Sequence, residues 1–80
     1  MQVTKTPHIH ATELMLKGHD DEHPWVRRPQ AAPSWSKGEI IQVEGRLCRV
    51  TNLHTETHEM DGLRHTWTRV WLEEVHPSVW

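Results

Sequence analysis

The sequence predicts a mainly β fold, either a small barrel or an antiparallel meander, preceded by a short N-terminal helix or strand and a proline-rich arm. Residues 38–54 read GEIIQVEGRLCRVTNLH, in which two short apolar runs are joined across Glu44-Gly45. Paired apolar runs that flank a tight turn containing glycine are typical of a β-hairpin. Residues 64–73, RHTWTRVWLE, add a run rich in tryptophan, threonine and valine, which are common in strands.

The N-terminal segment, residues 1–17, is compatible with a short helix or with a short strand. Thr6-Pro7 would begin a helix and Gly18 would end it. Leu14 and Leu16 also alternate, as they would in a strand. Over so few residues the hydrophobic period does not choose between the two, so both remain open.

Residues 18–38, GHDDEHPWVRRPQAAPSWSKG, are expected to form an extended arm, because they contain three prolines and no repeating apolar pattern. Trp25 and Trp35 would leave a large apolar area in water if the arm were free. We therefore expect the arm to lie across the rest of the domain or across a partner. The chain divides into this N-terminal segment with its arm, residues 1–38, and a β domain, residues 39–80.

From Glu39 onward the pattern predicts three strands, over residues 39–44, 46–54 and 64–73. Residues 54–62 are expected to form a longer, polar hairpin loop. Period-two spacing assigns one face of these strands to the core. The predicted inner face consists of Ile41, Val43, Cys48, Val50, Val70 and Leu72.

Residues 37–75 resemble the small SH3-like, KOW-type barrel at the start of translation elongation factor P. The shared pattern comprises Lys37-Gly38, Ile40, Ile41, Gly45, Arg49-Val50 and His54. The resemblance implies a small SH3-like barrel as the fold. The family carries a functional lysine at its hairpin tip, whereas no lysine or arginine lies between His54 and Gly62 here. The resemblance therefore implies the fold without the ribosomal role.

Composition restricts the classes of function. A chain of 80 residues makes one domain at most, and its single cysteine, Cys48, excludes an intrachain disulfide. The apolar stretches are too short for a membrane span, so we expect a cytoplasmic protein with no membrane partner. Residues 39–80 hold four Lys or Arg against seven Asp or Glu, which disfavours a duplex-DNA binder.

The hairpin loop contains the sharpest candidate for a metal site. Its candidate ligands are His54, Glu56, His58 and His65. The two arms of a hairpin lie about 5 Å apart, so His54 and His65 would face each other, with His58 or Glu56 as a third zinc ligand. The alternative is a solvated polar loop in a histidine-rich chain that needs no cofactor.

Two other classes have less support in the sequence. No phosphate-binding glycine loop or nucleophile elbow is present, and Cys48 lies within a predicted strand, so we predict no enzyme and no catalytic residue. Arg27-Arg28 with Trp25 and Trp35 would suit a single-stranded nucleic acid, because indoles stack on bases. The alternative is that these tryptophans pack onto the domain.

Alternation on the third strand places Trp67, Arg69 and Trp71 on the face opposite Val70 and Leu72. Tryptophan and arginine are the residues of interface hot spots, so we predict a non-enzymatic module that binds a protein partner or associates with itself. Trp25 and Trp35 complete the candidate partner-binding set. The alternative is that the arm covers the Trp67–Trp71 face. Short chains with this pattern look like accessory or structural proteins of bacteriophages, in the cytoplasm or the virion.

Overall fold

The computed structural model describes residues 8–20 and 22–76, and over these residues the protein is mainly β. The five strands are β1 (His8–Leu16), β2 (Val26–Arg28), β3 (Ile40–Val43), β4 (Arg46–Met60) and β5 (Leu63–Glu74). No helix occurs in the described residues, so the strand alternative for the N-terminal segment is confirmed and the helix alternative is wrong. The proposed helix start at Thr6-Pro7 lies outside the described residues, as does the segment that begins at Pro77.

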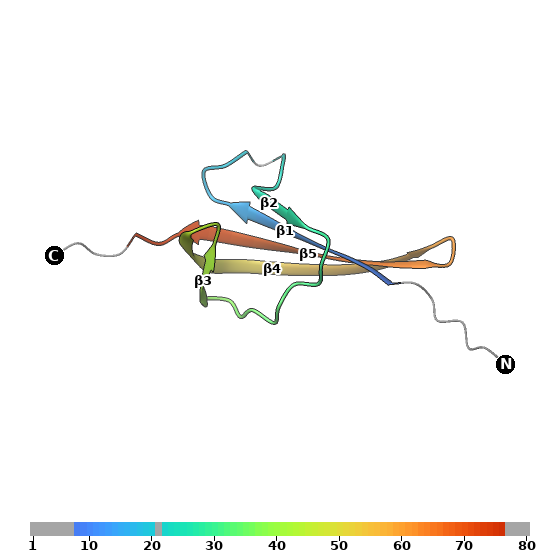
Figure 1. Ribbon diagram of the computed structural model, residues 1–80. Coiled ribbons are helices and arrows are strands. Elements are labelled where there is room, and N and C mark those ends of the chain that lie inside the picture. The colour runs from blue at the N-terminus through green and yellow to red at the C-terminus, as the bar shows by residue number, and fades with distance from the viewer. Residues whose placement is uncertain (1–7, 21, 77–80) are drawn as a thin grey trace.

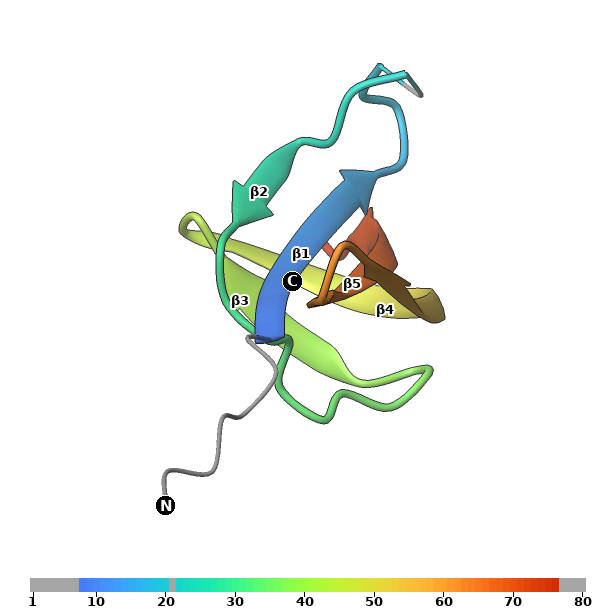
Figure 2. The same ribbon diagram turned by 90° about the vertical axis from the view of Figure 1, so that its right-hand side faces the viewer.

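All five strands belong to one sheet, in the order β2-β1-β5-β4-β3. β1 runs parallel to β5, and every other neighbouring pair is antiparallel. The sheet curls into a half-barrel, consistent with the predicted small SH3-like barrel (Figures 1 and 2). The curl brings its two edges together, since Arg28 Nη2 on β2 lies 3.7 Å from Glu44 Oε1 in the β3–β4 turn.

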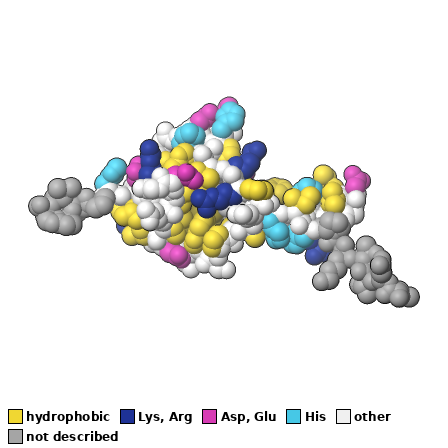
Figure 3. Space-filling view, viewed as in Figure 1, with side chains coloured by type: hydrophobic (Ala, Val, Ile, Leu, Met, Phe, Trp, Pro, Cys, Tyr) yellow, Lys and Arg dark blue, Asp and Glu magenta, His cyan; other side chains and the backbone are white. Residues whose placement is uncertain are grey.

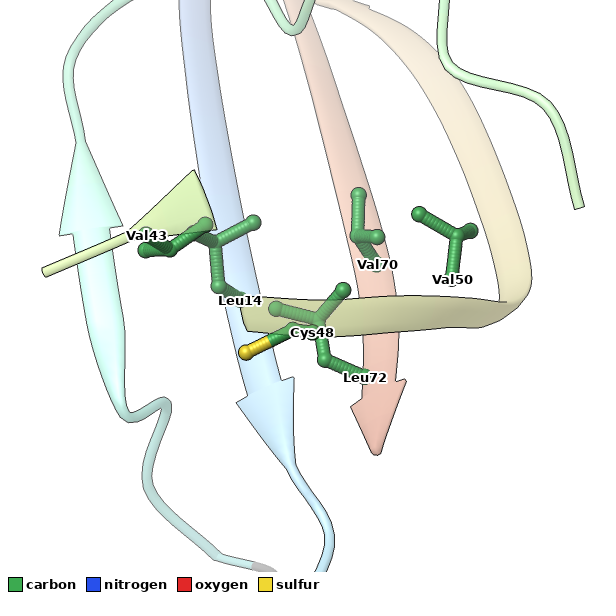
Figure 4. Packing of buried hydrophobic residues seen from close by; sticks show 6 residues of the cluster. All are labelled: Leu14, Val43, Cys48, Val50, Val70 and Leu72. Atoms are coloured by element: carbon green, nitrogen blue, oxygen red, sulfur yellow. The ribbon is translucent and has the colours of Figure 1, made fainter. Parts of the chain in front are cut away.

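The inner, concave face of the sheet holds the core (Figure 4). Its fully buried apolar side chains are Leu14, Val43, Cys48, Val50, Val70 and Leu72. The predicted inner face is therefore confirmed for all its members except Ile41, which is half-buried and packs against this cluster. Leu14 completes the core because β1 pairs with β5 and places Leu14 beside Val70.

The hairpin loop expected over residues 54–62 does not form. β4 and β5 instead continue to Met60 and Leu63, joined by a two-residue turn. Asp61 and Gly62 both have positive φ, 51° and 78°, as a type I′ turn requires. The Asp-Gly pair between alternating residues was the sequence signal for this turn, and the hairpin therefore projects as a long ribbon beyond the core (Figure 1).

The inner face changes character along this ribbon. Close to the core it is aliphatic, but toward the tip it presents threonine and histidine side chains. The Thr55 and Thr68 hydroxyl oxygens lie 3.1 Å apart and those of Thr57 and Thr66 2.9 Å apart, across β4 and β5. Threonine suits an exposed strand, because its branched Cβ favours the extended backbone while its hydroxyl remains polar.

The proline-rich arm packs onto the domain, as one of the two alternatives predicted. Trp25 and Trp35 are half-buried against the core cluster, on the inner face. The Trp25 backbone N–H donates to the Leu14 carbonyl at 2.8 Å, and the Arg46 guanidinium lies over the Trp25 ring, 5.9 Å from its centre. The arm also supplies β2, so residues 1–38 and 39–80 contribute strands to a single sheet.

Candidate interaction face

The outer face of the sheet is built around the side chains of Trp67, Arg69 and Trp71 on β5. β5 is the central strand of five, so these side chains have a neighbour on each side. The rows across the face are Met15-Trp71-Asn52, Glu13-Arg69-His54, Ala11-Trp67-Glu56 and Ile9-His65-His58. Trp67, Arg69 and Trp71 are each half-buried, because the neighbouring strands cover their flanks and leave their outer surfaces open.

An ion-pair cluster fixes the middle of this face. Arg69 Nη2 donates to Glu13 Oε1 at 3.1 Å, and Arg27 Nη2 on β2 donates to Glu13 Oε2 at 2.8 Å. Burial raises the pKa of the Glu13 carboxyl, but the hydrogen bonds from Arg27 and Arg69 outweigh it and hold the pKa below its usual value. A carboxylate that accepts from two guanidinium groups stays ionised, so the cluster holds Arg69 in one position on the face.

Histidine and glutamate side chains from β4 line the other side of the face. The His58 ring stacks on the Trp67 ring, with centres 4.8 Å apart and planes 11° from parallel. Glu56 accepts from His54 Nε2 at 2.8 Å and from His58 Nε2 at 3.3 Å. These two hydrogen bonds lower the pKa of the Glu56 carboxyl. Figure 3 shows histidine side chains on the β4–β5 ribbon that projects beyond the core, and others elsewhere on the molecule.

A groove of about 490 Å³ opens beside Trp71. Its walls come from the end of β1, the turn that follows β1, and β5. The side chains that line it include Met15, Lys17, Asp20, Arg69, Trp71 and Glu73. Its walls therefore combine an indole with side chains of both charges.

The other two candidate partner-binding tryptophans lie elsewhere. Trp25 and Trp35 pack against the inner core, whereas Trp67 and Trp71 belong to the outer face. The sequence-based alternative in which the arm covers the Trp67–Trp71 face is therefore not what the described residues adopt. The arm tryptophans lie on the opposite side of the sheet, while Gly18, Asp20 and Arg27 of the arm border the outer face.

Three of the four candidate metal ligands meet in the structure, since Glu56 accepts from both His54 and His58, but the predicted pairing of His54 with His65 does not form. His65 lies opposite His58, whereas His54 lies opposite Arg69 and not opposite His65 as expected. The expectation failed because the loop assumed between the strands is a two-residue turn, which moves the register. Among the described residues, the side chains that meet the spacing of a three-ligand site are Asp20, Glu22 and His23, all exposed in a surface loop.

Cys48 lies in the core and not on the outer face. Burial raises the pKa of the Cys48 thiol, which favours the unreactive thiol over the thiolate.

No helix in residues 8–20 and 22–76 has the length and apolar character to cross a membrane.

Comparison of the chain with protein-family models, curated proteins and solved structures finds no match.

Proposed function

We propose that the protein is a non-enzymatic binding module that contacts a partner protein through its outer face. One observation carries the proposal. The tryptophans of the arm pack on the inner face, and Trp67, Arg69 and Trp71 remain half-buried, with part of each side chain exposed on the outer face. An aromatic and arginine surface of this kind is enriched at protein interfaces and rare on the remaining surface.

The geometry of the face supports binding with little reorganisation. Arg69 is fixed by Glu13, and Trp67 is fixed by the stacked ring of His58. Side chains that are already ordered lose less conformational entropy on binding, which increases affinity. The groove beside Trp71 gives the partner a place to insert a side chain.

The alternative functions have less support. The predicted zinc site would need His54 and His65 to face each other, with His58 or Glu56 as a third ligand, and the β4–β5 register separates His54 from His65. A single-stranded nucleic acid would need free cations and stacking surfaces on the arm. Arg27 is instead paired with Glu13, and Trp25 and Trp35 pack on the core.

The test compares partner capture by tagged wild-type protein with capture by Trp67→Ala/Trp71→Ala in cells of the protein's own source, followed by measurement of affinity for the captured protein. We expect the double variant to weaken binding about 100-fold or more, as the loss of two hot-spot residues does. The control is Ile40→Ala/Leu47→Ala, which removes exposed apolar side chains on β3 and β4, away from the central rows. Equal affinity for all three proteins would refute the proposal.

A further inference from the structure

β4 has 15 residues, whereas β3, which pairs with it on the side away from β5, has only four. β3 pairs with Arg46–Arg49 of β4. Val50 makes two further backbone bonds on this side, since its N–H donates to the Glu39 carbonyl and its carbonyl accepts from the Gly38 N–H. Beyond the register shift at Thr51, residues 52–60 pair with β5 on one side only. No described segment pairs with the other side, so the ribbon carries an open edge of nine residues.

The turn decides which backbone groups lie on the open edge. Met60 and Leu63 flank the two-residue turn and form a hydrogen-bonded pair, as in every hairpin of this type. Hydrogen-bonded and non-bonded pairs alternate along an antiparallel ladder. Thr55, Thr57 and Glu59 therefore direct their N–H and C=O groups away from β5, and all three residues are exposed.

This edge carries two charged side chains, Glu56 and Glu59, but few of the other features by which proteins prevent pairing. No proline and no lysine or arginine occurs in residues 52–60, and the register shift at Thr51 lies before the open stretch. An exposed, regular edge with unpaired donors and acceptors is a template for another strand. The exposed threonines favour an extended backbone, which keeps this part of β4 ready to pair with another strand.

We propose that the open edge of β4 pairs antiparallel with the same edge of a second copy of this chain, about a two-fold axis at Thr57. In this register Thr57 lies opposite Thr57 of the second copy. Glu56, which accepts from His54 and His58 of its own chain, then also lies opposite His58 of the second copy. The symmetry repeats this contact, so the dimer places two carboxylate–imidazole pairs on the outer face. This inference rests on the backbone groups of β4, whereas the proposed partner contact rests on side chains of β5. The inference does not depend on that partner contact.

The neighbouring registers are less favourable, for two reasons. An axis one residue away places like groups directly opposite one another. At Glu56 it sets Glu56 against Glu56 and His54 against His58, and at His58 it sets His58 against His58. An axis at Thr55 restores histidine–glutamate pairs but brings Met60 of the second copy against Val50, whose N–H already donates to Glu39. Only the axis at Thr57 combines unlike pairs with an unobstructed edge.

The first test measures the molar mass of the full chain by sedimentation velocity over a concentration series. We expect a reversible dimer for wild type. Thr57→Pro removes one outward N–H and is compatible with an edge position, so it should raise the dissociation constant about tenfold or more. The matched control, Thr57→Ala, keeps the N–H and should dimerise like wild type. Tryptophan fluorescence and circular dichroism verify that both variants are folded.

The second test examines the register by exchange of charge. His58→Glu alone sets a carboxylate against Glu56 of the second copy and should weaken the dimer. His58→Glu with Glu56→Lys restores opposite charges and should restore the dimer. A wild-type chain that stays monomeric at millimolar concentration would overturn the inference, as would a dimer that survives Thr57→Pro. A dimer that is lost only in Trp67→Ala/Trp71→Ala would assign self-association to the outer face and would also overturn it.

Discussion

Glu13 and Arg69 lie directly opposite each other on the parallel strands β1 and β5, and Arg69 Nη2 donates to Glu13 Oε1 at 3.1 Å. The second carboxylate oxygen of Glu13 accepts from Arg27 on β2. One carboxylate with a side chain only 15% exposed therefore connects the arm to the centre of the outer face. The arm closes the inner core and also fixes the residue at the middle of the proposed binding surface.

Replacement of Glu13 tests this connection. Glu13→Gln leaves a side chain of nearly the same shape but removes the charge that both guanidinium groups contact, so the free energy of unfolding should fall by about 1–2 kcal/mol. The measurement is urea unfolding followed by tryptophan fluorescence. Glu59→Gln is the control, since its ion pair with Arg64 lies on the exposed ribbon and should contribute less. Equal losses for both variants would show that the cluster is no more stabilising than a surface pair.

The same carboxylate predicts how stability depends on pH. Folding lowers the pKa of Glu13 below its ordinary value of 4.5, so folding favours the ionised form. The resulting stabilisation is complete above pH 4.5 and is lost as the pH falls from there through the lower pKa of the folded state. Wild type should therefore lose more stability than Glu13→Gln over this range. Parallel curves for the two proteins would contradict the assignment.

The core can be tested at Val50, which is fully buried between β3 and β5. Val50→Ala should lower the free energy of unfolding by about 1–3 kcal/mol, because the truncation leaves a small cavity. Thr57→Ala, on the exposed ribbon, is the control and should change the monomer by less than about 0.5 kcal/mol. Chemical denaturation at low protein concentration measures both. A larger loss at Thr57 would mean that the ribbon, and not the core, dominates stability.

The type I′ turn gives a prediction at Gly62, whose φ of 78° is unfavourable for a residue with a side chain. A Cβ at Gly62 would meet no atom within 4 Å, so the cost of Gly62→Ala comes from the backbone alone. We expect a loss of about 1–2 kcal/mol, confined to the ribbon. Amide hydrogen exchange should therefore increase for residues 55–68 and change little in the core. Uniform acceleration across the sheet would contradict a local effect.

Much of the fold was predictable because the strands near the core follow the period-two rule. Ile41 and Val43 alternate on β3, Cys48 and Val50 alternate on β4 before the bulge, and Val70 and Leu72 alternate on β5. β1 was ambiguous because Leu14 and Leu16 alternate as in a strand, whereas Thr6-Pro7 and Gly18 suit the two ends of a helix. Its parallel partner, β5, is also distant in the sequence. Such non-local pairing leaves no local signal. The Asp61-Gly62 turn did have a signal, but the polar residues around it favoured a loop.

The residues of the outer face could be predicted from the sequence, but the side of the sheet on which the arm packs could not. Alternation alone placed Trp67, Arg69 and Trp71 together. Which side of the sheet the arm covers depends on how the sheet curls, and no residue pattern encodes that directly. The expected pairing of His54 with His65 was wrong for a related reason, since a change in turn length alters which side chains face each other.

The most direct test of the central claim compares two double variants of the free, full chain by urea unfolding at low concentration. Trp25→Ala/Trp35→Ala removes the arm tryptophans from the core, and Trp67→Ala/Trp71→Ala removes the tryptophans of the outer face. If the arm seals the core and the outer face serves a partner, the first variant should lose about 3–5 kcal/mol and the second less than about 2 kcal/mol. The reverse order, with the outer-face variant unfolded and the arm variant intact, would contradict the claim.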